Sequence, residues 1–501
     1  MNDYIVEQKD IEILMQSDKV LFYKLELLNE NLKVLDYVEG NLISDNISIS
    51  ADSDIRRTYT CELVVTNSTF DIGHDKTIWF NRRIRPYIGV LHQRTQEVSY
   101  YLLGTFLFVD SGYNYDPTTN KLSLTCNDMM CLLNGVRGGN LNLYKRTILE
   151  GTDARSVIIE ILKEVGINKY FIEFNINNDI LSTFKVPYDL VYNAGMTAYQ
   201  IIKDLVDLYP GTEMYFSKDG VFMIDRVPTG KNEQVILNDE IIQPILINEQ
   251  INTSFSTVYN HIEIWGKINE PDYYSKEVSM ADNVYYSTIV TTKLNEDDNS
   301  YTDIYYDEYD NFDVFALKIP ATNKENQQIN INNLGNVPIH DDKGKSLPAN
   351  YLAANTDCIF RYIEETNEFL FIGEYQCHSE CYLTNNVNDK SENAVIDTDN
   401  EFAIEKIGTK LKVLSGVDFD KIPTSGLCLQ RCRYELYNAT NKQENLNLNV
   451  IAIPWLNVNQ IIEFTSHLTN KAEKYIINNI SCNYANFTMS ISANRFFAEY
   501  I

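Results

Sequence analysis

The chain has 501 residues, too many for one hydrophobic core, and this length predicts roughly three or four domains. A hydrophobic content of 44% excludes a largely disordered chain, and 34 Tyr and 22 Phe favour strands over helices. The net charge of −28 argues against a general phosphate-binding protein, because nucleic-acid binding relies on Lys and Arg.

Residues 1–142 are predicted to form a first small β-barrel domain. Strands are expected at 20–27, 32–37, 46–50, 58–65, 84–91, 101–109 and 122–126. In the fourth of these, Tyr59, Cys61, Leu63 and Val65 alternate with polar residues, and this period of two marks a half-buried strand. Short strands at this spacing are typical of a small barrel or sandwich.

Residues 143–249 are predicted to form an α+β domain. A first helix is expected at 153–165, and a second helix begins with Thr197 and Gln200 in the positions of a capping box. A β-hairpin follows, with its turn at 218–220.

A second β-barrel domain is predicted from two separated segments, 250–268 and 432–501, with 269–431 inserted between them. Strand character is expected to return at 434–437. The acidic, tyrosine-rich stretch 295–313 of the insertion is expected to be a solvated loop, with a weak cation site as the alternative. The fold class is therefore α+β and mostly β, with two related small β-barrel domains flanking an α+β module.

Two stretches near opposite ends of the chain carry one pattern. Trp79 and Asn81 precede an alternating apolar strand, and Trp455 and Asn457 stand at the same offset before another. Each motif is followed by a further pair of strands, which predicts that the two β-domains are duplicates. The alternative is two unrelated β-meanders. We expect both Trp side chains to be core anchors, with a carbohydrate-stacking platform as the alternative.

The sequence contains no motif of a known catalytic or cofactor site. It has no nucleophile elbow, no H-E-x-x-H, no P-loop and no dinucleotide-binding fingerprint. The six histidines are scattered and unpaired: His74, His92, His261, His340, His378 and His467. We therefore expect neither an enzyme nor a bound cofactor.

Nine cysteines in a chain without a signal-peptide pattern are expected to be reduced thiols in a protein made in a cytoplasm. Two C-x-x-x-C pairs, Cys377 with Cys381 and Cys428 with Cys432, could supply four thiolates to a structural zinc. The usual spacing is C-x-x-C, and in strands the observed spacing would place both sulfur atoms on one side. Buried thiols are therefore the main expectation, and zinc is the alternative. No apolar run is long enough to predict a membrane span.

Four short motifs resemble the hub proteins of phage tails and of related contractile injection machines. They are Ile78–Asn81, Gly104–Asp110, Leu122–Asp128 and Ile453–Asn459. The strand-turn-strand that includes Asp110 looks like the closing hairpin in the first domain of such hubs. The resemblance implies a structural virion protein that forms a homotrimer, in which two related barrels per subunit make a pseudo-sixfold ring.

Such a hub would connect the sixfold tail tube, or a distal tail protein, to the threefold spike or tip and would contact the tape-measure protein. DNA would pass through its channel without specific binding, because an acidic ring repels it. The expected location is the baseplate or tip of the virion tail, after assembly in the cytoplasm of a bacterial host and without membrane contact. A carbohydrate-binding adhesin of the tail tip and a cell-wall hydrolase are the alternatives. Because the chain ends directly after the last barrel strand, we expect such activities on another subunit.

Overall fold

The computed structural model describes most of residues 5–495. Residues outside the description are 1–4, 68–69, 75, 142–144, 175–184, 187, 210, 229–233, 269–270, 276, 295–300, 342–343, 375, 417, 423–424, 442–443, 469 and 496–501, and only the backbone is described at 110–111, 291–294, 301–305, 374 and 441. The chain divides into two compact units. The barrel unit comprises Met1–Asn175, Thr183–Val258 and Tyr437–Glu499, and the inserted unit comprises Ile176–Ser182, Tyr259–Leu436 and Tyr500–Ile501.

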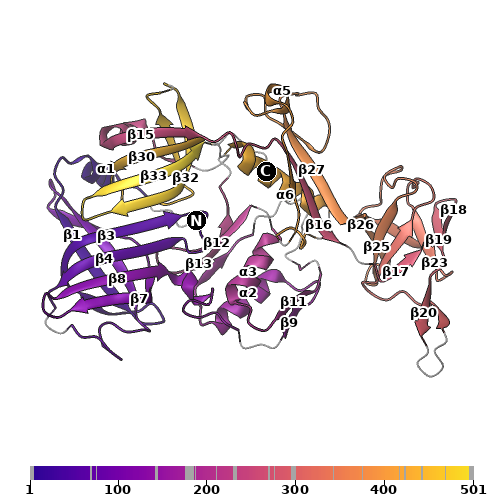
Figure 1. The fold of residues 1–501 in the computed structure, drawn as a ribbon, viewed down its shortest axis with the longest axis horizontal. Coiled ribbons are helices and arrows are strands. Elements are labelled where there is room, and N and C mark those ends of the chain that lie inside the picture. Colours follow the sequence, from indigo (N-terminus) through magenta and orange to yellow (C-terminus); the bar gives the residue numbers. More distant parts are fainter. Residues whose placement is uncertain are drawn as a thin grey trace. The chain divides into compact units, whose positions relative to one another are not determined.

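The barrel unit contains a 14-stranded sheet whose strands come from both ends of the chain (Figure 1). After helix α1 (Gln8–Met15), its N-terminal strands are β1 (Leu21–Leu28), β2 (Val34–Val38), β3 (Gly40–Ser50), β4 (Arg57–Val65), β5 (Arg83–His92), β6 (Glu97–Leu102), β7 (Phe106–Asp116) and β8 (Lys121–Asp128). The alternation expected on β4 is confirmed, because Tyr59, Cys61, Leu63 and Val65 all lie in the core.

The C-terminal strands of this sheet are β14 (Val235–Leu237), β15 (Leu246–Thr253), β30 (Glu444–Ile451), β31 (Ile461–Thr465), β32 (Ala472–Asn483) and β33 (Thr488–Arg495). Helix α4 (Asp239–Ile242) and the short 3₁₀ helix η2 (Gln243–Ile245) precede β15. The strand order is β15-β30-β33-β32-β3-β4-β8-β7-β5-β1-β2, with β31 beside β32, β14 beside β31 and β6 beside β5. One hydrophobic cluster includes Phe106 from the N-terminal strands and Phe464 from the C-terminal ones. The two predicted barrels therefore share a sheet and a core.

An α+β module lies between these two sets of strands in the sequence. After the 3₁₀ helix η1 (Met129–Leu132), its elements are β9 (Lys145–Ile148), α2 (Ala154–Glu164), β10 (Tyr170–Ile172), β11 (Leu190–Asn193), α3 (Ala198–Asp207), β12 (Thr212–Phe216) and β13 (Phe222–Arg226). Asp153 caps α2 by accepting from the Ser156 amide at 2.6 Å. Thr197 and Gln200 form the expected capping box of α3. The predicted helices and hairpin are confirmed.

The described part of the inserted unit contains three further sheets. A four-stranded sheet contains β28 (Ala394–Ile396), β27 (Gln376–Thr384), β16 (His261–Ile268) and β29 (Leu411–Leu414). The helices are α5 (Ile404–Ile407) and α6 (Ser425–Asn441), the last of which extends beyond this unit. An eight-stranded sheet contains β17 (Tyr273–Ser275), β22 (Val314–Lys318), β25 (Asp357–Ile363), β26 (Glu368–Glu374), β24 (Val337–His340), β23 (Gln328–Ile331), β19 (Val284–Ser287) and β18 (Val278–Ala281), and a separate pair contains β20 (Val290–Leu294) and β21 (Tyr301–Tyr305).

The structure separates the segment 250–268, which the sequence assigns to one domain. Strand β15 pairs with β30 in the barrel unit, whereas β16 pairs with β27 and β29 in the inserted unit. The strand expected at 434–437 is wrong, because these residues belong to α6. The helix has a buried face at Cys428, Cys432 and Leu436, and this spacing of four residues is helical.

The stretch 295–313 is also more structured than a solvated loop. Its first six residues, 295–300, lie outside the described residues, but 301–305 form β21. Tyr306 lies in a hydrophobic cluster, and its hydroxyl donates to Asp313 at 2.7 Å. Buried aromatic rings therefore explain part of the tyrosine content here. In the described part of the chain, no helix is long and apolar enough to cross a membrane.

Candidate functional site: two equivalent runs of strands and their edges

The two parts of the large sheet have the same strand order. The N-terminal run is β3-β4-β8-β7-β5, and the C-terminal run is β15-β30-β33-β32-β31. Neighbouring strands are antiparallel throughout both runs. The duplication inferred from the Trp–Asn motifs therefore extends to topology.

The closing hairpins determine which residues are equivalent. The β7–β8 hairpin closes at the pair Asp116–Lys121, and the β32–β33 hairpin closes at the pair Asn483–Thr488. Counted from these ends through the strand registers, the equivalent residues are Cys126 and Ala493, Leu124 and Ile491, Tyr59 and Leu446, and Ile47 and Ile251. The alternation of buried and more exposed side chains matches at equivalent positions of β4 and β30, and of β8 and β33. The correspondence therefore holds for packing as well.

Strands β3 and β32 join the two runs, and we call this pairing the internal seam. Residues Ile47–Ser50 pair antiparallel with Asn479–Cys482. The Ala51 amide extends the contact by donating to the Asn478 carbonyl at 2.8 Å. This carbonyl belongs to an irregularity in β32, where the register against β33 shifts. The first strand of one run thus pairs with the fourth strand of the other.

A buried carboxylate lies at the far end of the internal seam. Asp45 accepts a hydrogen bond from the Ala485 amide at 2.9 Å, and next to it the Ser481 hydroxyl donates to Asn46 at 3.1 Å. Burial raises the pKa of Asp45 to about 6, against an ordinary value of 3.8, and the backbone hydrogen bonds only partly offset this. The seam therefore contains an ionisable group as well as strand pairing.

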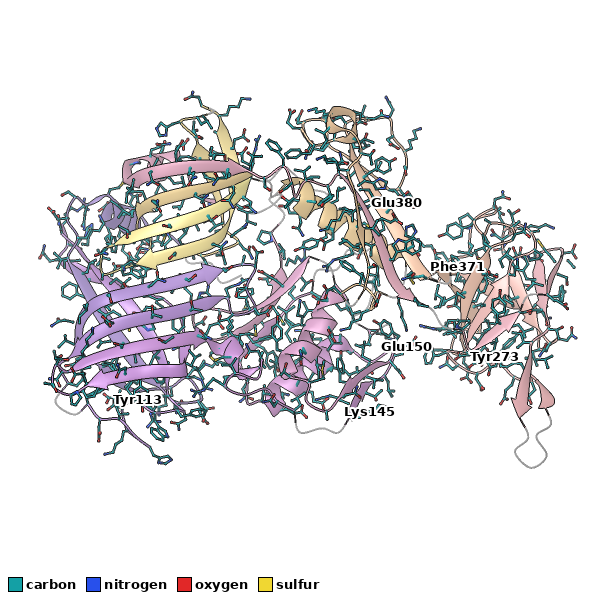
Figure 2. All side chains as sticks on the ribbon, in the orientation of Figure 1. Tyr113, Lys145, Glu150, Tyr273, Phe371 and Glu380 are labelled. Carbon is teal, nitrogen blue, oxygen red and sulfur yellow. The ribbon has the colours of Figure 1, made fainter. Side chains whose placement is uncertain are left out.

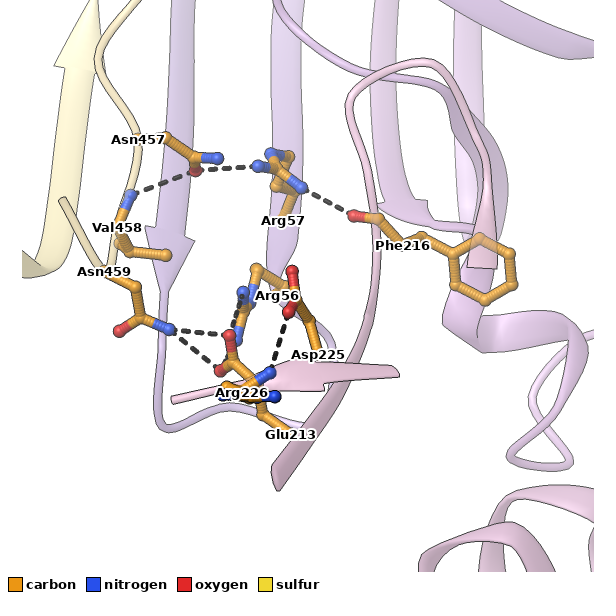
Figure 3. A network of polar contacts seen from close by, with 9 residues as sticks. All are labelled: Arg56, Arg57, Glu213, Phe216, Asp225, Arg226, Asn457, Val458 and Asn459. Carbon is orange, nitrogen blue, oxygen red and sulfur yellow. Dashed lines mark hydrogen bonds and ion pairs between the residues drawn. The ribbon is translucent and has the colours of Figure 1, made fainter. Parts of the chain in front are cut away.

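Arg57 connects both runs to the α+β module (Figure 3). Its guanidinium donates to the Phe216 carbonyl and to the Asn457 side chain, each at 2.7 Å. Its own amide donates to Asp128 at 2.9 Å. Burial lowers the pKa of Arg57 to about 10 and raises that of Asp128 to about 6. Asn457 of the second motif is thus an acceptor for a buried cation.

A second group of contacts lies beside Arg57 in the same view (Figure 3). Arg56 forms an ion pair with Glu213 on β12, and its guanidinium lies 4.0 Å from the centre of the Tyr215 ring. Asn459 donates to both carboxylate oxygens of Glu213 at 2.8 Å. Breaking a buried pair by removing one partner is strongly destabilising, so these contacts fix the α+β module against the sheet.

The two Trp–Asn motifs have different surroundings. Trp455 is 2% exposed and lies in the main core, with its ring centre 5.7 Å from that of Tyr101. Trp79 is only half-buried and lies outside that core cluster. The Asn81 side-chain oxygen is buried and accepts no hydrogen bond from any described residue. The side chain of Asp110 lies outside the described part of the structure, so its expected structural role stays a prediction.

Trp79 lines a groove on the N-terminal run, which we call the aromatic groove. Its volume is about 860 Å³, and its lining residues are Trp79, Phe80, Phe108, Val109, Gly112, Tyr113, Val136 and Arg137. The Arg137 guanidinium lies 3.5 Å from the centre of the Phe80 ring and donates to the Phe108 carbonyl at 2.6 Å. Phe80 is 62% exposed and Val136 is 53% exposed. Contiguous exposed apolar groups of this kind mark interaction sites.

A second cavity, of about 490 Å³, lies near Trp455, and its lining includes Lys218, whose side chain is half-buried. The Lys218 amine donates to the Trp455 carbonyl at 3.2 Å and to the Pro454 carbonyl at 3.5 Å. Burial, with a smaller contribution from the nearby Arg57 charge, lowers the pKa of Lys218 to about 7. Sequence reasoning assigns Lys218 only to a hairpin turn, because nothing in the local pattern predicts burial there.

The four cysteines proposed as zinc ligands come from one strand and one helix. Cys377 and Cys381 lie on β27, Cys428 and Cys432 lie on α6, and all four are buried. The Cys432 thiol donates to the Ser379 carbonyl at 3.2 Å. Burial, with smaller contributions from the Cys377 and Cys432 thiols, raises the pKa of Cys428, and a hydrogen bond with Cys381 together with burial raises the pKa of Cys432. Among described residues, no group of three or more His, Cys, Asp or Glu could hold a metal ion.

Comparison with known proteins finds one family model that matches part of the chain, and several solved structures. A family model described as "Domain of unknown function (DUF5048)" matches residues 399–500. No curated protein matches the chain.

The solved structures that resemble the chain include three tail proteins. The 43 kDa tail protein of prophage MuSo2 from Shewanella oneidensis has a TM-score of 0.46 and 10% identity, with 94% of this chain and 98% of that chain covered. A tail protein from Neisseria meningitidis MC58 has a TM-score of 0.45 and 5% identity, covering 94% and 96%. Prophage tail protein gp18 from Listeria monocytogenes EGD-e has a TM-score of 0.41 and 8% identity, covering 94% of each chain.

Proposed function

We propose that three copies of this chain form the hub of a phage tail or of a related injection machine. The main support for this proposal is that each chain contains two equivalent runs of strands, joined edge to edge at the internal seam. The role is structural, with no catalysis by the chain itself. The hub connects a sixfold tail tube, or a distal tail protein, to a threefold spike or tip.

Two free strand edges of the sheet support association between chains by the same kind of strand pairing as in the internal seam. Among the described residues, β15 pairs with β30 on one side only, and Tyr113–Asp116 of β7 pairs with β8 only. These edges are the equivalents of β3 and of the second half of β32, which pair within the chain. An unpaired strand edge is a template for another strand, and closed symmetry is the usual result for such contacts. Three chains then provide six equivalent runs for a sixfold partner.

The charge supports a channel that does not retain DNA. A net charge of −28 per chain leaves few cations for phosphate contacts, so DNA passes without counterion release and without specific binding. The tape-measure protein would occupy the same passage before DNA leaves.

The oligomeric mass of the purified chain tests this proposal. Native mass spectrometry should give about 173 kDa, three times the chain mass of 57.8 kDa. The same sample should not retain a DNA duplex at moderate salt. A monomer at all accessible concentrations, or tight salt-sensitive DNA binding, would refute the hub assignment.

A further inference from the structure

We infer that Phe255 of one copy docks into the aromatic groove of the next copy, beside a β15–β7 strand pairing between the two chains. This interface rests on the proposed ring of chains, and it assigns particular residues to the contact that closes the ring. The internal seam is the template, because it is the same contact made within one chain.

The internal seam shows where the residue after the first strand goes. Ala51 lies just beyond β3, and it packs against the core and donates to the Asn478 carbonyl at the irregularity in β32. Ala51 stands two residues after Ile49, which lies opposite Ile480. In the C-terminal run Thr253 is equivalent to Ile49, so Phe255 is the equivalent of Ala51.

The register of β7, the equivalent of β32, places the aromatic groove opposite Phe255. Tyr113 lies opposite Leu124, as Ile480 lies opposite Ile491, so Tyr113 is the equivalent of Ile480. The irregularity of β32 next to Asn478 corresponds to the break in β7 between Phe108 and Tyr113. This break carries Val109 and Gly112, and both line the aromatic groove. A chain paired in the seam register therefore brings Phe255 to the groove.

Both surfaces are exposed in the single chain. Phe255 is 70% exposed, and Ile247 on the outer edge of β15 is 58% exposed. Tyr113, at the lower border of the sheet in Figure 2, is 38% exposed. At Gly112 a Cβ would come within 2.4 Å of the Val109 carbonyl oxygen, so the wall of the groove has a fixed backbone path. Burying an aromatic side chain in such a pocket is the usual form of an interface anchor.

The seam register also predicts the pairs of residues across the interface. Ser48 lies opposite Ser481 in the internal seam, and their equivalents are Asn252 on β15 and Asn114 on β7. Antiparallel neighbours have Cα atoms about 4.5–5.5 Å apart, which suits a disulfide. In the full chain, Asn114→Cys combined with Asn252→Cys should therefore give an oxidised cross-link between copies. The nine native cysteines are buried and should leave little background. The control pairs Asn252→Cys with Thr118→Cys in the hairpin turn, which is too far along the strand to cross-link.

Phe255→Asp tests the anchor separately. It should weaken association by at least about tenfold. The melting temperature of the monomer should not change, because the side chain is exposed in the single chain. Leu468→Asp is the matched control, since Leu468 is 75% exposed and lies on neither strand edge, and it should associate like the parent chain.

The outcomes separate this inference from the hub proposal. A trimer that lacks the in-register cross-link and tolerates Phe255→Asp would overturn this interface and leave the hub proposal standing. A parent chain that stays monomeric and gives no cross-link would overturn both. Cross-linked trimers in the double variant, together with dissociation of Phe255→Asp, would support both.

Discussion

Replacing Lys218 with Met should change how the stability of the protein depends on pH. In the folded chain, burial lowers the pKa of the Lys218 amine to about 7, against an ordinary value of 10.5. At a pH between these two pKa values, Lys218 is protonated in the unfolded chain and neutral in the folded chain. The parent protein therefore gains stability as pH rises from about 7 to about 10.5 and loses it as pH falls through this range.

The magnitude follows from the same values. If Lys218 were fully buried, the unfolding free energy would fall by about 4 kcal/mol as pH falls from 10 to 7, which is about 1.4 kcal/mol for each pH unit. Lys218 also lines an open cavity, so water screens part of this effect, and we expect about 2 kcal/mol. The variant lacks this slope, although it loses hydrogen bonds to the Trp455 and Pro454 carbonyls at every pH.

Urea unfolding of both proteins at pH 7, 8, 9 and 10 measures the difference. The curve of Lys218→Met minus that of the parent should fall by about 2 kcal/mol between pH 7 and pH 10. Lys471→Met, at an exposed lysine, controls for the loss of a positive charge. Parallel curves of unfolding free energy against pH for the parent and Lys218→Met would refute the lowered pKa of Lys218.

Three further changes have distinct expected results. Trp455→Ala should cost about 3–5 kcal/mol in denaturant unfolding, and Trp79→Ala, at a half-buried position, less than half as much; equal costs would contradict their different burial. The parent should lose up to about 3 kcal/mol of unfolding free energy as pH rises from about 4 to about 6, because the folded Asp45 carboxyl binds its proton more tightly than the unfolded one. Asp45→Asn keeps the acceptor for the Ala485 amide and should abolish this loss. An unchanged pH profile would contradict this. Replacing Tyr259–Leu436 with a short Gly-Ser linker should leave the barrel unit folded, because Thr253 and Glu444 are strand neighbours across the excision; loss of cooperative unfolding would contradict it.

Regular periodicity is what made much of the fold predictable from the sequence. The alternation at Tyr59 and Cys61 placed β4 correctly, and the capping box at Thr197 placed the start of α3. The helix through 434–437 was not predicted, because its buried face at Cys428 and Cys432 has the spacing of a same-side strand pair as well.

The site itself was less predictable, because it depends on contacts between distant segments. Arg57 and Asn457 are 400 residues apart in the sequence and meet only in the folded chain, and no local pattern indicates that contact. The strand order repeats, but the strand registers make Arg83 the equivalent of Ile461, so Trp79 and Trp455 are not equivalent residues. The motif also gave no sign that Trp455 is buried while Trp79 lines a groove. Phe255 is likewise recognisable only after the register makes it the equivalent of Ala51.

The most direct test of the hub assignment is an end-on cryo-electron microscopy map of the assembled chain. The proposal predicts three copies around an open axis, with six runs of strands and with internal β3–β32 pairings alternating with β15–β7 pairings between chains. An assembly with another number of copies, or one in which β15 and the second half of β7 both face solvent, would contradict it.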